Sequence, residues 1–413
     1  MTEVSQWRVL ILHMINKDKV TQFAKFQLSI LERLSSGEDS REIAERVREK
    51  VFMYHNPLTG LPHGSELGIS VNDICNLTCK HCYYASTHDK SLQGKVSGLS
   101  VDDWRNLTSE AIEKGIRHIS IVGKEPLLSP HETRAILETA DKKRLDYPEV
   151  RYELITNGTL IKKEIDWLKD FNFYFFSVSV DGNREMHDYV RGNGNYDRTL
   201  EGIKIARESG IKNITTIFTA MPHNISSLSD MVRDISDAGV EYLSIGFCFP
   251  TQLNVPTTHS NSSAVKQVLD NLYNAPKNLD ITISLLGDDH ANIIGNLYKG
   301  GFFDHREIAV TEDLAPCLIF PVSDNPRTAI QLNIIPTMFY SGFRVDYNGT
   351  AMDFCVDLRT SEKREGFGNV KRESLTELIE KSKLIWSAYT EKYYLRLQKA
   401  LQGEQVPIVQ SWY

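Results

Sequence analysis

The sequence predicts an α/β protein whose central part is a partial (β/α)6 barrel of the TIM type. Apolar strand-like runs alternate with helix-like segments six times between residues 66 and 250, which is typical of parallel sheets joined by helices. Short polar motifs follow several of these runs, at the strand ends where parallel barrels place their functional residues. Four segments are therefore expected: a helical N-terminal accessory segment at 1–65, the barrel at 66–250, an irregular connecting region at 251–330 and a small α+β domain at 331–413.

Each element of the barrel is bounded by a local signal. The strand-like runs are apolar and short, whereas the segments between them carry apolar residues at helical spacing. Ser100 begins the first helix as an N-cap, and Gly115 ends it. Strands are expected at 67–71, 118–122, 152–156, 174–180, 214–219 and 242–247, and helices at 100–114, 131–142, 162–169, 196–209 and 226–238.

The flanking segments are predicted from the same signals. The N-terminal segment is expected to hold a strand at 7–15 and two amphipathic helices, carrying Phe23, Phe26, Ile30 and Leu34 in the first and Ile43, Val47 and Val51 in the second. These helices are expected to pack against the barrel, the alternative being a docking surface for a peptide or partner. Beyond the barrel, the sequence predicts a helix near 264–274, a strand at 281–285, a hairpin with its turn at 346–349 and a helix at 374–400.

Composition and charge argue against several classes of protein. The 413 residues are 41% hydrophobic and 24% charged, as in soluble globular proteins. A net charge of −7 without a basic stripe gives no reason to expect nucleic acid binding. The N-terminal apolar run is too short for a signal or membrane segment, so no membrane partner is expected. Six cysteines without an export signal indicate the reducing cytoplasm.

Half of the six cysteines lie in one C-x3-C-x2-C stretch, at Cys75, Cys79 and Cys82. Three thiolates this close indicate one soft metal centre, because clustered thiolates repel one another and oxidise unless a metal binds them. Protein iron–sulfur clusters normally have four cysteine ligands, so three would leave one iron open to a substrate or cofactor. The alternative from the spacing alone is a zinc site completed by His81 or His88.

Three polar motifs follow the second, third and fourth predicted strands. Gly-Lys-Glu-Pro at 123–126 combines a glycine, which permits close backbone approach, with an acid that can accept from an ammonium. Thr-Asn-Gly at 156–158 has the composition of a turn. Ser-Val-Asp-Gly at 179–182 precedes Arg191, whose planar guanidinium matches a carboxylate.

The triplet and these motifs, in this order, resemble the radical S-adenosylmethionine (SAM) enzymes. The resemblance implies a barrel of the radical SAM type in which the three cysteines hold a 4Fe–4S cluster and SAM chelates the fourth iron. One electron, from a donor such as flavodoxin or ferredoxin, would cleave SAM to methionine and a 5′-deoxyadenosyl radical that abstracts hydrogen from the substrate. The other cofactor-binding residues that the resemblance implies are His81, Tyr83, Gly123, Glu125, Asn157, Ser179 and Arg191.

The resemblance also assigns a part of SAM to each motif. Gly123 and Glu125 would hold the methionine amino group, and Asn157 would lie near the ribose. Ser179 and Arg191 would bind the carboxylate of SAM. The assignment of these residues to different strand ends predicts that they converge on one ligand.

Three further positions keep more than one interpretation. For Arg191 the alternative to SAM binding is a surface ion pair with Asp188. Lys124 stands where the family usually has a second glycine, and it motivates the alternative of a non-catalytic SAM-binding iron–sulfur protein. Cys248 follows the sixth strand, where it either fills a small apolar site, donates a hydrogen atom as a catalytic residue, or ligates a second cluster.

The C-terminal region resembles the auxiliary-cluster domain called SPASM, or its shortened form, twitch. Cys317, Cys355, the hairpin at 345–349 and the stretch at 366–370 carry this resemblance. The tail at 407–413 lacks the further cysteines that the family usually has, so a degenerate SPASM/twitch-like scaffold is favoured. Cys317 and Cys355, with Cys248, are candidate ligands of a second iron–sulfur cluster.

The resemblance implies two classes of substrate. The Cys-Lys-His-Cys-Tyr stretch at 79–83 and the SPASM-like tail most resemble enzymes that modify ribosomally made peptides in natural-product maturation. The alternative is an epimerase, lyase or dehydrogenase acting on a sugar or another small natural-product intermediate. Because a complete auxiliary cluster would lack ligands, a redox-neutral reaction is favoured over an oxidative one.

Overall fold

The computed structural model describes residues 17–52, 65–82, 98–248, 262–272, 275–276, 278–286, 291–302, 309–310, 318–321, 328–333, 342–352, 366–404 and 406. Within these ranges only the backbone is described at 17–24, 50–52, 262, 284–286, 309–310, 318–321 and 328–333. Its strands form one curved sheet in the order β13-β12-β11-β1-β2-β3-β4-β5-β6-β7-β10-β9-β8. Neighbouring strands from β11 through β10 are parallel, and the strands at both edges are antiparallel. The predicted α/β class with a partial parallel barrel is therefore confirmed.

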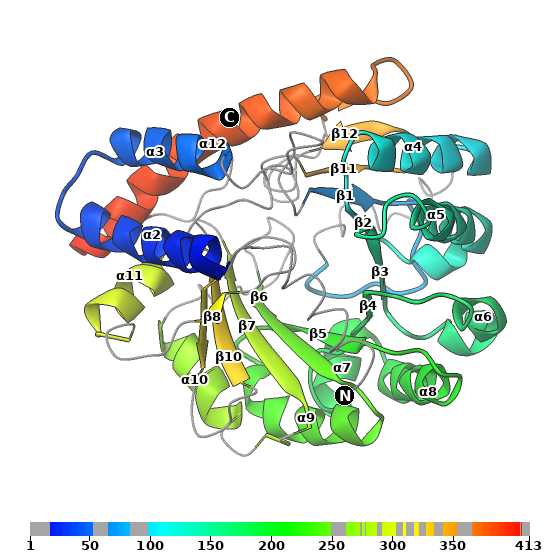
Figure 1. Ribbon diagram of the computed structural model, residues 1–413. Coiled ribbons are helices and arrows are strands. Elements are labelled where there is room, and N and C mark those ends of the chain that lie inside the picture. The colour runs from blue at the N-terminus through cyan, green and yellow to red at the C-terminus, as the bar shows by residue number, and fades with distance from the viewer. Residues whose placement is uncertain are drawn as a thin grey trace.

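The barrel alternates strands and helices, with the helices on the outer side of the sheet (Figure 1). Its strands are β1 (Glu66–Ile69), β2 (His118–Ile121), β3 (Arg151–Thr156), β4 (Phe175–Ser179), β5 (Ile214–Ala220) and β6 (Tyr242–Phe247). Its helices are α4 (Val101–Glu113), α5 (Pro130–Lys143), α6 (Ile161–Leu168), α7 (Arg184–Arg191), α8 (Asn195–Glu208) and α9 (Leu228–Asp237), with short 3₁₀ turns η2 (Pro126–Leu128) and η3 (Ile225–Ser227). All six predicted strands are present, whereas α7 was not predicted.

The sheet continues on both sides of the six predicted strands. After β6 come α10 (Ser262–Leu272), β7 (Asp280–Leu286), α11 (Ala291–Lys299), β8 (Ala309–Val310), β9 (Leu318–Pro321) and β10 (Thr328–Asn333). β7 pairs with β6, so the strand expected at 281–285 belongs to the barrel sheet. On the other side, the predicted hairpin is β11 (Phe343–Val345) and β12 (Thr350–Met352), which joins β1 through β11 and carries β13 (Gly368–Asn369) at its outer edge.

The N-terminal helices pack on the C-terminal helix. α2 (Lys17–Ser35) and α3 (Ser40–Phe52) lie beside α12 (Leu375–Gln402) in Figure 1. The predicted apolar positions of α2 and α3 that the structure describes with side chains belong to the main hydrophobic core. These helices therefore pack into the main core, chiefly on α12 rather than on the barrel against which they were expected to pack. The strand expected at 7–15 lies outside the described residues, and the four segment boundaries stay predictions.

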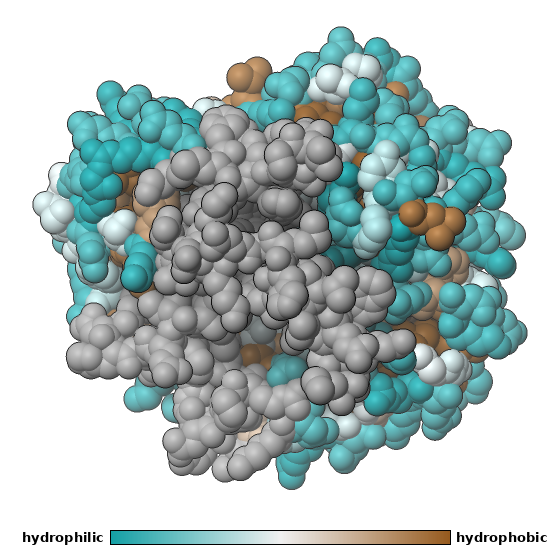
Figure 2. Space-filling model, viewed as in Figure 1, coloured by the Kyte–Doolittle hydropathy of each residue, from teal (hydrophilic) through white to brown (hydrophobic). Residues whose placement is uncertain are grey.

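The described surface is mostly polar. On the face drawn in Figure 2, hydrophilic side chains dominate the described part, and apolar residues form small separate patches. Among the described residues, no helix combines the length and the apolar character that crossing a membrane would require.

Candidate active site

The three cysteines lie on the loop after β1, at the C-terminal edge of the sheet. Cys79 is buried, whereas Cys75 and Cys82 are partly exposed, and none of them forms a disulfide. The Cys82 N–H donates to the Cys79 carbonyl at 3.1 Å, and the Leu77 N–H donates to the Cys75 Sγ at 3.4 Å. One short loop therefore brings all three thiols to the same edge.

Backbone hydrogen bonds attach this loop to its neighbours. The Glu125 N–H donates to the carbonyl of Ile74 at 3.1 Å, and the Lys80 N–H donates to the carbonyl of Val190 at 2.9 Å. The Asn72 side-chain amide donates to the Glu125 carbonyl at 2.9 Å. The cysteine loop is thus held by the turn after β2 on one side and by α7 on the other.

The thiols share one electrostatic environment. Burial raises the pKa of Cys75 to about 11 and the pKa of Cys79 to about 12, and the neighbouring thiols add to both increases. Arg191 opposes the increase at Cys79, and Lys124 opposes it at Cys75. Because metal ligands must be deprotonated, thiols this hard to ionise are expected to lose their protons to a metal rather than to water.

The turn after β2 requires a glycine. Gly123 has φ +113°, and a Cβ on it would lie 2.5 Å from the Ser70 hydroxyl oxygen. A side chain there would be strained in its backbone and would also collide with β1's end. Gly123 thus lets this turn lie directly against the start of the cysteine loop.

The buried Glu125 carboxylate joins two of the predicted motifs. Its Oε1 accepts from the Leu127 N–H at 3.0 Å and from the Thr156 hydroxyl at 2.8 Å. Its Oε2 accepts from the Asn157 N–H at 2.9 Å. Burial raises its pKa above the ordinary value even though these donors favour the ionised form. Glu125 therefore fixes the turn after β3 against the turn after β2.

Asn157 continues this connection to the cysteine loop. Its side-chain amide donates to the Asn76 side-chain oxygen at 2.9 Å, and its own oxygen accepts from the Thr159 N–H at 3.0 Å. Gly158 follows with φ +83°, and a Cβ on it would lie 2.7 Å from the Val178 side chain. The Thr-Asn-Gly motif is thus a turn, and it is also in direct contact with the loop that carries the thiols.

The residue that organises the other side of the site is Asp181, just after β4. It is fully buried, and its Oδ2 accepts from the Arg191 Nε–H at 2.5 Å. The same oxygen lies 3.5 Å from the His81 Nε2, and Oδ1 accepts from the Thr219 N–H at 2.9 Å. Burial alone would raise its pKa, but Arg191, His81 and the Thr219 N–H together outweigh it and hold the pKa below the usual range.

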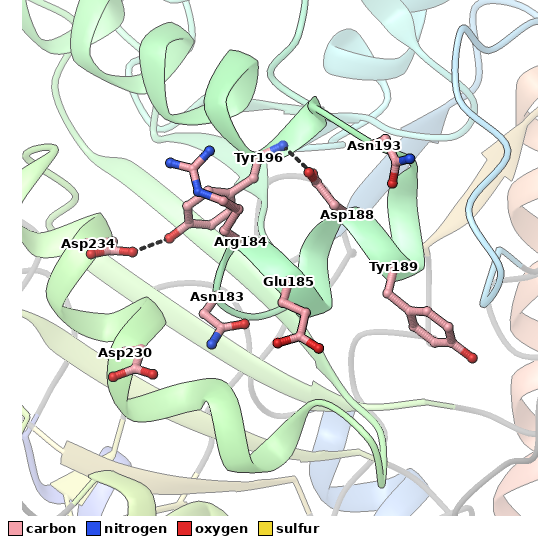
Figure 3. A pocket seen from close by; sticks show the side chains of 9 residues that line it. All are labelled: Asn183, Arg184, Glu185, Asp188, Tyr189, Asn193, Tyr196, Asp230 and Asp234. Atoms are coloured by element: carbon pink, nitrogen blue, oxygen red, sulfur yellow. Dashed lines mark hydrogen bonds between the residues drawn. The ribbon is translucent and has the colours of Figure 1, made fainter.

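Arg191 therefore pairs with Asp181, and the alternative of a surface pair with Asp188 is wrong. The Asp188 carboxylate instead accepts from the backbone N–H groups of Gly194 and Tyr196, each at 2.8 Å. It belongs to a pocket between α7, α8 and α9 (Figure 3). The Arg191 guanidinium instead reaches the cysteine loop, where its Nη1 donates to the Cys79 Sγ at 3.9 Å.

Two histidines beside Asp181 keep an unpartnered ring nitrogen. Burial lowers the pKa of His81 to about 4, and burial with Arg191 lowers the pKa of His187 to about 4. Both rings are therefore neutral near pH 7. The His81 Nδ1 and the His187 Nε2 are buried without a hydrogen-bond partner among the described residues. Such orphaned groups are costly unless a ligand or water satisfies them.

Of the remaining predicted residues, the structure describes Ser179 and Cys248. Ser179 ends β4, and its hydroxyl makes no hydrogen bond in the described part of the chain, so it is available to a ligand. Cys248 is buried beside Val190 and Met221, and burial raises the pKa of its thiol to about 11. Tyr83, Cys317 and Cys355 lie outside the described residues.

The residues present fit a cubane cluster with a bound amino-acid-like cofactor. Three thiols supply soft ligands from one loop, and a buried guanidinium lies within reach of one of them. The unpartnered His81 nitrogen and the available Ser179 hydroxyl add polar groups for a ligand. Sequence reasoning assigned no role to Asp181, although an acid between a strand and a glycine was a usable signal.

The fold is a parallel barrel with a loop of three cysteines at the C-terminal ends of its strands, and comparison with known proteins identifies the domain to which this loop belongs. The model of the Radical SAM superfamily matches residues 69–235. That part of the chain is a radical SAM domain, of an enzyme family that uses a 4Fe–4S cluster and SAM.

Known relatives are similar to about half of the chain or less. A probable GTP 3′,8-cyclase of Methanocaldococcus jannaschii is 28% identical over 42% of this chain and 55% of its own length. AlbA, the antilisterial bacteriocin subtilosin biosynthesis protein of Bacillus subtilis, is 28% identical over 41% of this chain and 36% of its own length. The chain thus spans about half the length of the curated relatives it matches.

A solved structure resembles more of the fold. SuiB of Streptococcus suis, bound to the precursor peptide SuiA, matches with a TM-score of 0.55 and 14% identity. The match covers 82% of this chain and 68% of SuiB. At this identity the likeness shows the fold alone, and it extends beyond the radical SAM domain.

Proposed function

We propose that the protein reductively cleaves SAM and uses the 5′-deoxyadenosyl radical to abstract hydrogen from a peptide substrate. The observation that carries this proposal is the position of the cysteine loop, whose three thiols lie at the strand ends with Arg191 beside Cys79. When bound, the cluster and SAM supply the radical chemistry. The chain itself binds and orients these groups and keeps water away from them.

The cysteine triplet, Ser179 and Arg191 each have a definite part in this proposal. Cys75, Cys79 and Cys82 hold the cluster, and Arg191 and Ser179 bind the SAM carboxylate. Arg191 suits this part because it is buried and already charged, so a carboxylate finds a preorganised partner. Lys124 adds a second cation beside Cys75.

Glu125 and Asn157 enter the proposal differently. The Glu125 oxygens accept from three protein donors, so an ammonium would have to use their remaining lone pairs. Its hydrogen bonds to Thr156 and Asn157 fix the turn that lies nearest the predicted ribose position. Glu125 therefore supports the pocket whether or not it also contacts SAM.

A peptide is the proposed substrate, and a small molecule is the second candidate. AlbA is a bacteriocin biosynthesis protein, and the SuiB structure holds the precursor peptide SuiA. Both agree with the resemblance in the sequence to peptide-modifying enzymes. The GTP 3′,8-cyclases among the relatives favour a small molecule instead. A reductant such as flavodoxin or ferredoxin, in a reducing compartment, completes the proposal.

The activity is tested with anaerobically reconstituted protein, dithionite and SAM. The expected result is formation of 5′-deoxyadenosine, absent from the Cys75/Cys79/Cys82→Ala variant. Wild-type protein that binds SAM but forms no 5′-deoxyadenosine would instead support the non-catalytic interpretation.

The substrate is tested by adding candidate substrates to the same assay. A candidate ribosomally made precursor peptide is expected to increase 5′-deoxyadenosine formation and to change in mass. GTP serves as the matched small-molecule probe. Stimulation by GTP and not by the peptide would contradict the peptide proposal while leaving the radical SAM activity intact.

A further inference from the structure

Asp181 uses all of its backbone and side-chain groups at once. Its Oδ1 accepts from Thr219 at the end of β5, and its Oδ2 accepts from Arg191 at the end of α7. Its N–H donates to the His187 Nδ1 at 3.2 Å, and its carbonyl accepts from the Asn224 amide at 3.2 Å. With 0% of the residue exposed, the carboxylate has one orientation.

The chain around Asp181 is built for this position. Gly182 has φ +127°, and a Cβ on it would lie 2.5 Å from the Ser227 hydroxyl oxygen. Asn183 then caps α7 by accepting from the Met186 N–H at 3.2 Å. The helix that starts there ends at Arg191, so Asp181 binds the far end of the helix that it precedes.

This contact determines where the Arg191 guanidinium points. A guanidinium is a planar fork, and fixing its Nε–H leaves the terminal nitrogens in one plane and direction. Asp181 takes the Nε–H, and Nη1 then faces the Cys79 Sγ. Without the carboxylate, the side chain would lose both its buried counter-charge and its direction.

We propose that Asp181 is a positioning residue that orients Arg191 toward the SAM carboxylate beside the cysteine loop. This role rests on the proposed function, because it requires SAM at that edge. Asp181 does not touch SAM in this account and acts through Arg191. It also restrains His81, on the cysteine loop, from the opposite side.

The first test is Asp181→Asn, which keeps the shape of the side chain and removes its charge. SAM affinity is measured from the change in the electron paramagnetic resonance spectrum of the reduced cluster as SAM is added. The variant is expected to keep about four irons and to bind SAM about tenfold more weakly or worse, as is common when an orienting partner is removed. Binding equal to wild type would overturn the role.

Asp188→Asn is the matched control. Asp188 is also on α7 and also accepts backbone N–H groups, but it lines the pocket in Figure 3 rather than the cysteine edge. Its loss is expected to lower stability while leaving SAM affinity unchanged. If both variants weaken SAM binding equally, Asp181 acts only by holding α7, and the positioning role is rejected.

Arg191→Lys tests the same contact by changing the other residue of the pair. It replaces the first test if Asp181→Asn does not fold. Lysine keeps the charge but lacks the Nε–H and the fork, so SAM binding is expected to weaken. Unchanged affinity would overturn the role. In the double variant, Asp181→Asn should add little to the loss of SAM affinity caused by Arg191→Lys, because the effects of coupled residues are not additive. Fully additive losses would show that Asp181 does not act through Arg191.

The two proposals fail in different ways. A wild-type protein that carries the cluster but does not bind SAM defeats the proposed function, and this role with it. Wild-type binding that Asp181→Asn leaves unchanged defeats only the positioning role.

Discussion

Carboxylates lie at both ends of the barrel strands, and their pKa values are shifted in opposite directions at the two ends. At the C-terminal edge, Arg191, His81 and a backbone N–H hold the pKa of Asp181 below its usual range. At the start of β1, burial and then Glu153 raise the pKa of Glu66 to about 8. Asp181 stays ionised because it is paired with the Arg191 cation that we expect to bind a ligand. In the described part of the chain Glu66 has no such cation beside it, so it is neutralised by a proton.

At the N-terminal end, Ser120 connects the two acids, Glu66 and Glu153. Ser120 on β2 donates to the Glu153 Oε1 at 2.6 Å and also hydrogen bonds to Glu66. His118 pairs with Glu66 in the sheet register, and its Nε2 lies 4.0 Å from the Glu153 Oε2. Burial lowers its pKa to about 3. His118 is therefore neutral near pH 7 and provides no positive charge to these acids. Protonation of Glu66 is for this reason more favourable than its ionisation.

The largest expected effect is that of Arg191→Ala, which would break the charge pair at the C-terminal edge. It leaves Asp181 buried and unpaired, so a loss of about 3–5 kcal/mol in the free energy of unfolding is expected, together with weaker SAM binding. Arg184→Ala is the matched control, because Arg184 is exposed on the same helix and pairs with Asp197. Because that pair is exposed to solvent, its loss should change denaturant unfolding very little. Equal losses for both variants would contradict the buried pair.

Glu125→Gln should have the next largest effect. The amide replaces one acceptor oxygen by a donor, which would face an N–H or hydroxyl that the carboxylate now accepts. A loss of about 1–3 kcal/mol in unfolding free energy is expected. Glu138→Gln, on the exposed face of α5, should cost far less. A Glu125→Gln variant as stable as wild type would show that these hydrogen bonds do not hold the two turns together.

The N-terminal end predicts a dependence of stability on pH. The folded pKa of Glu66, about 8, lies above its ordinary 4.5, so its contribution is fully present below pH 4.5 and is lost as the pH rises through 8. Between pH 6 and pH 9 the melting temperature of wild type should fall on the order of 5 °C more than that of Glu66→Gln. Parallel melting curves for the two proteins would contradict a protonated Glu66.

Cys248→Ala is expected to have the smallest effect. The thiol packs in a small apolar cluster with Val190 and Met221, so a loss of about 1 kcal/mol is expected. Iron content and 5′-deoxyadenosine formation should not change. A variant that still forms 5′-deoxyadenosine but no longer releases the wild-type product would instead identify Cys248 as the hydrogen donor.

The order of the barrel elements could be predicted from the sequence, because short apolar runs and glycine stops mark them clearly. The strand expected at 118–122 is β2, and Ser100 caps α4 as expected. Helix α7 was missed because it has only eight residues, Arg184–Arg191, most of them polar. The continuation of the sheet through β7 and β10 also escaped prediction, since parallel pairing between distant segments leaves no local pattern.

The candidate site was predicted in part for the same reason. Motifs after parallel strands must meet at one edge, so the contact of Glu125 with the Thr-Asn-Gly turn follows from their order. The partner of Arg191 does not follow, because helix spacing favours Asp188 and only the fold brings Asp181 to it. The roles of the other predicted SAM contacts stay predictions.

The central claim is that Cys75, Cys79 and Cys82 hold the cluster, and metal analysis tests it most directly. Anaerobically reconstituted wild type should hold about four irons, with the electron paramagnetic resonance signal of a reduced 4Fe–4S cluster. The Cys75/Cys79/Cys82→Ala variant should hold essentially none. One zinc in the wild-type protein, or full iron content in the variant, would contradict the claim. A surviving 4Fe–4S signal in the variant would show a second cluster and overturn the preference for a redox-neutral reaction.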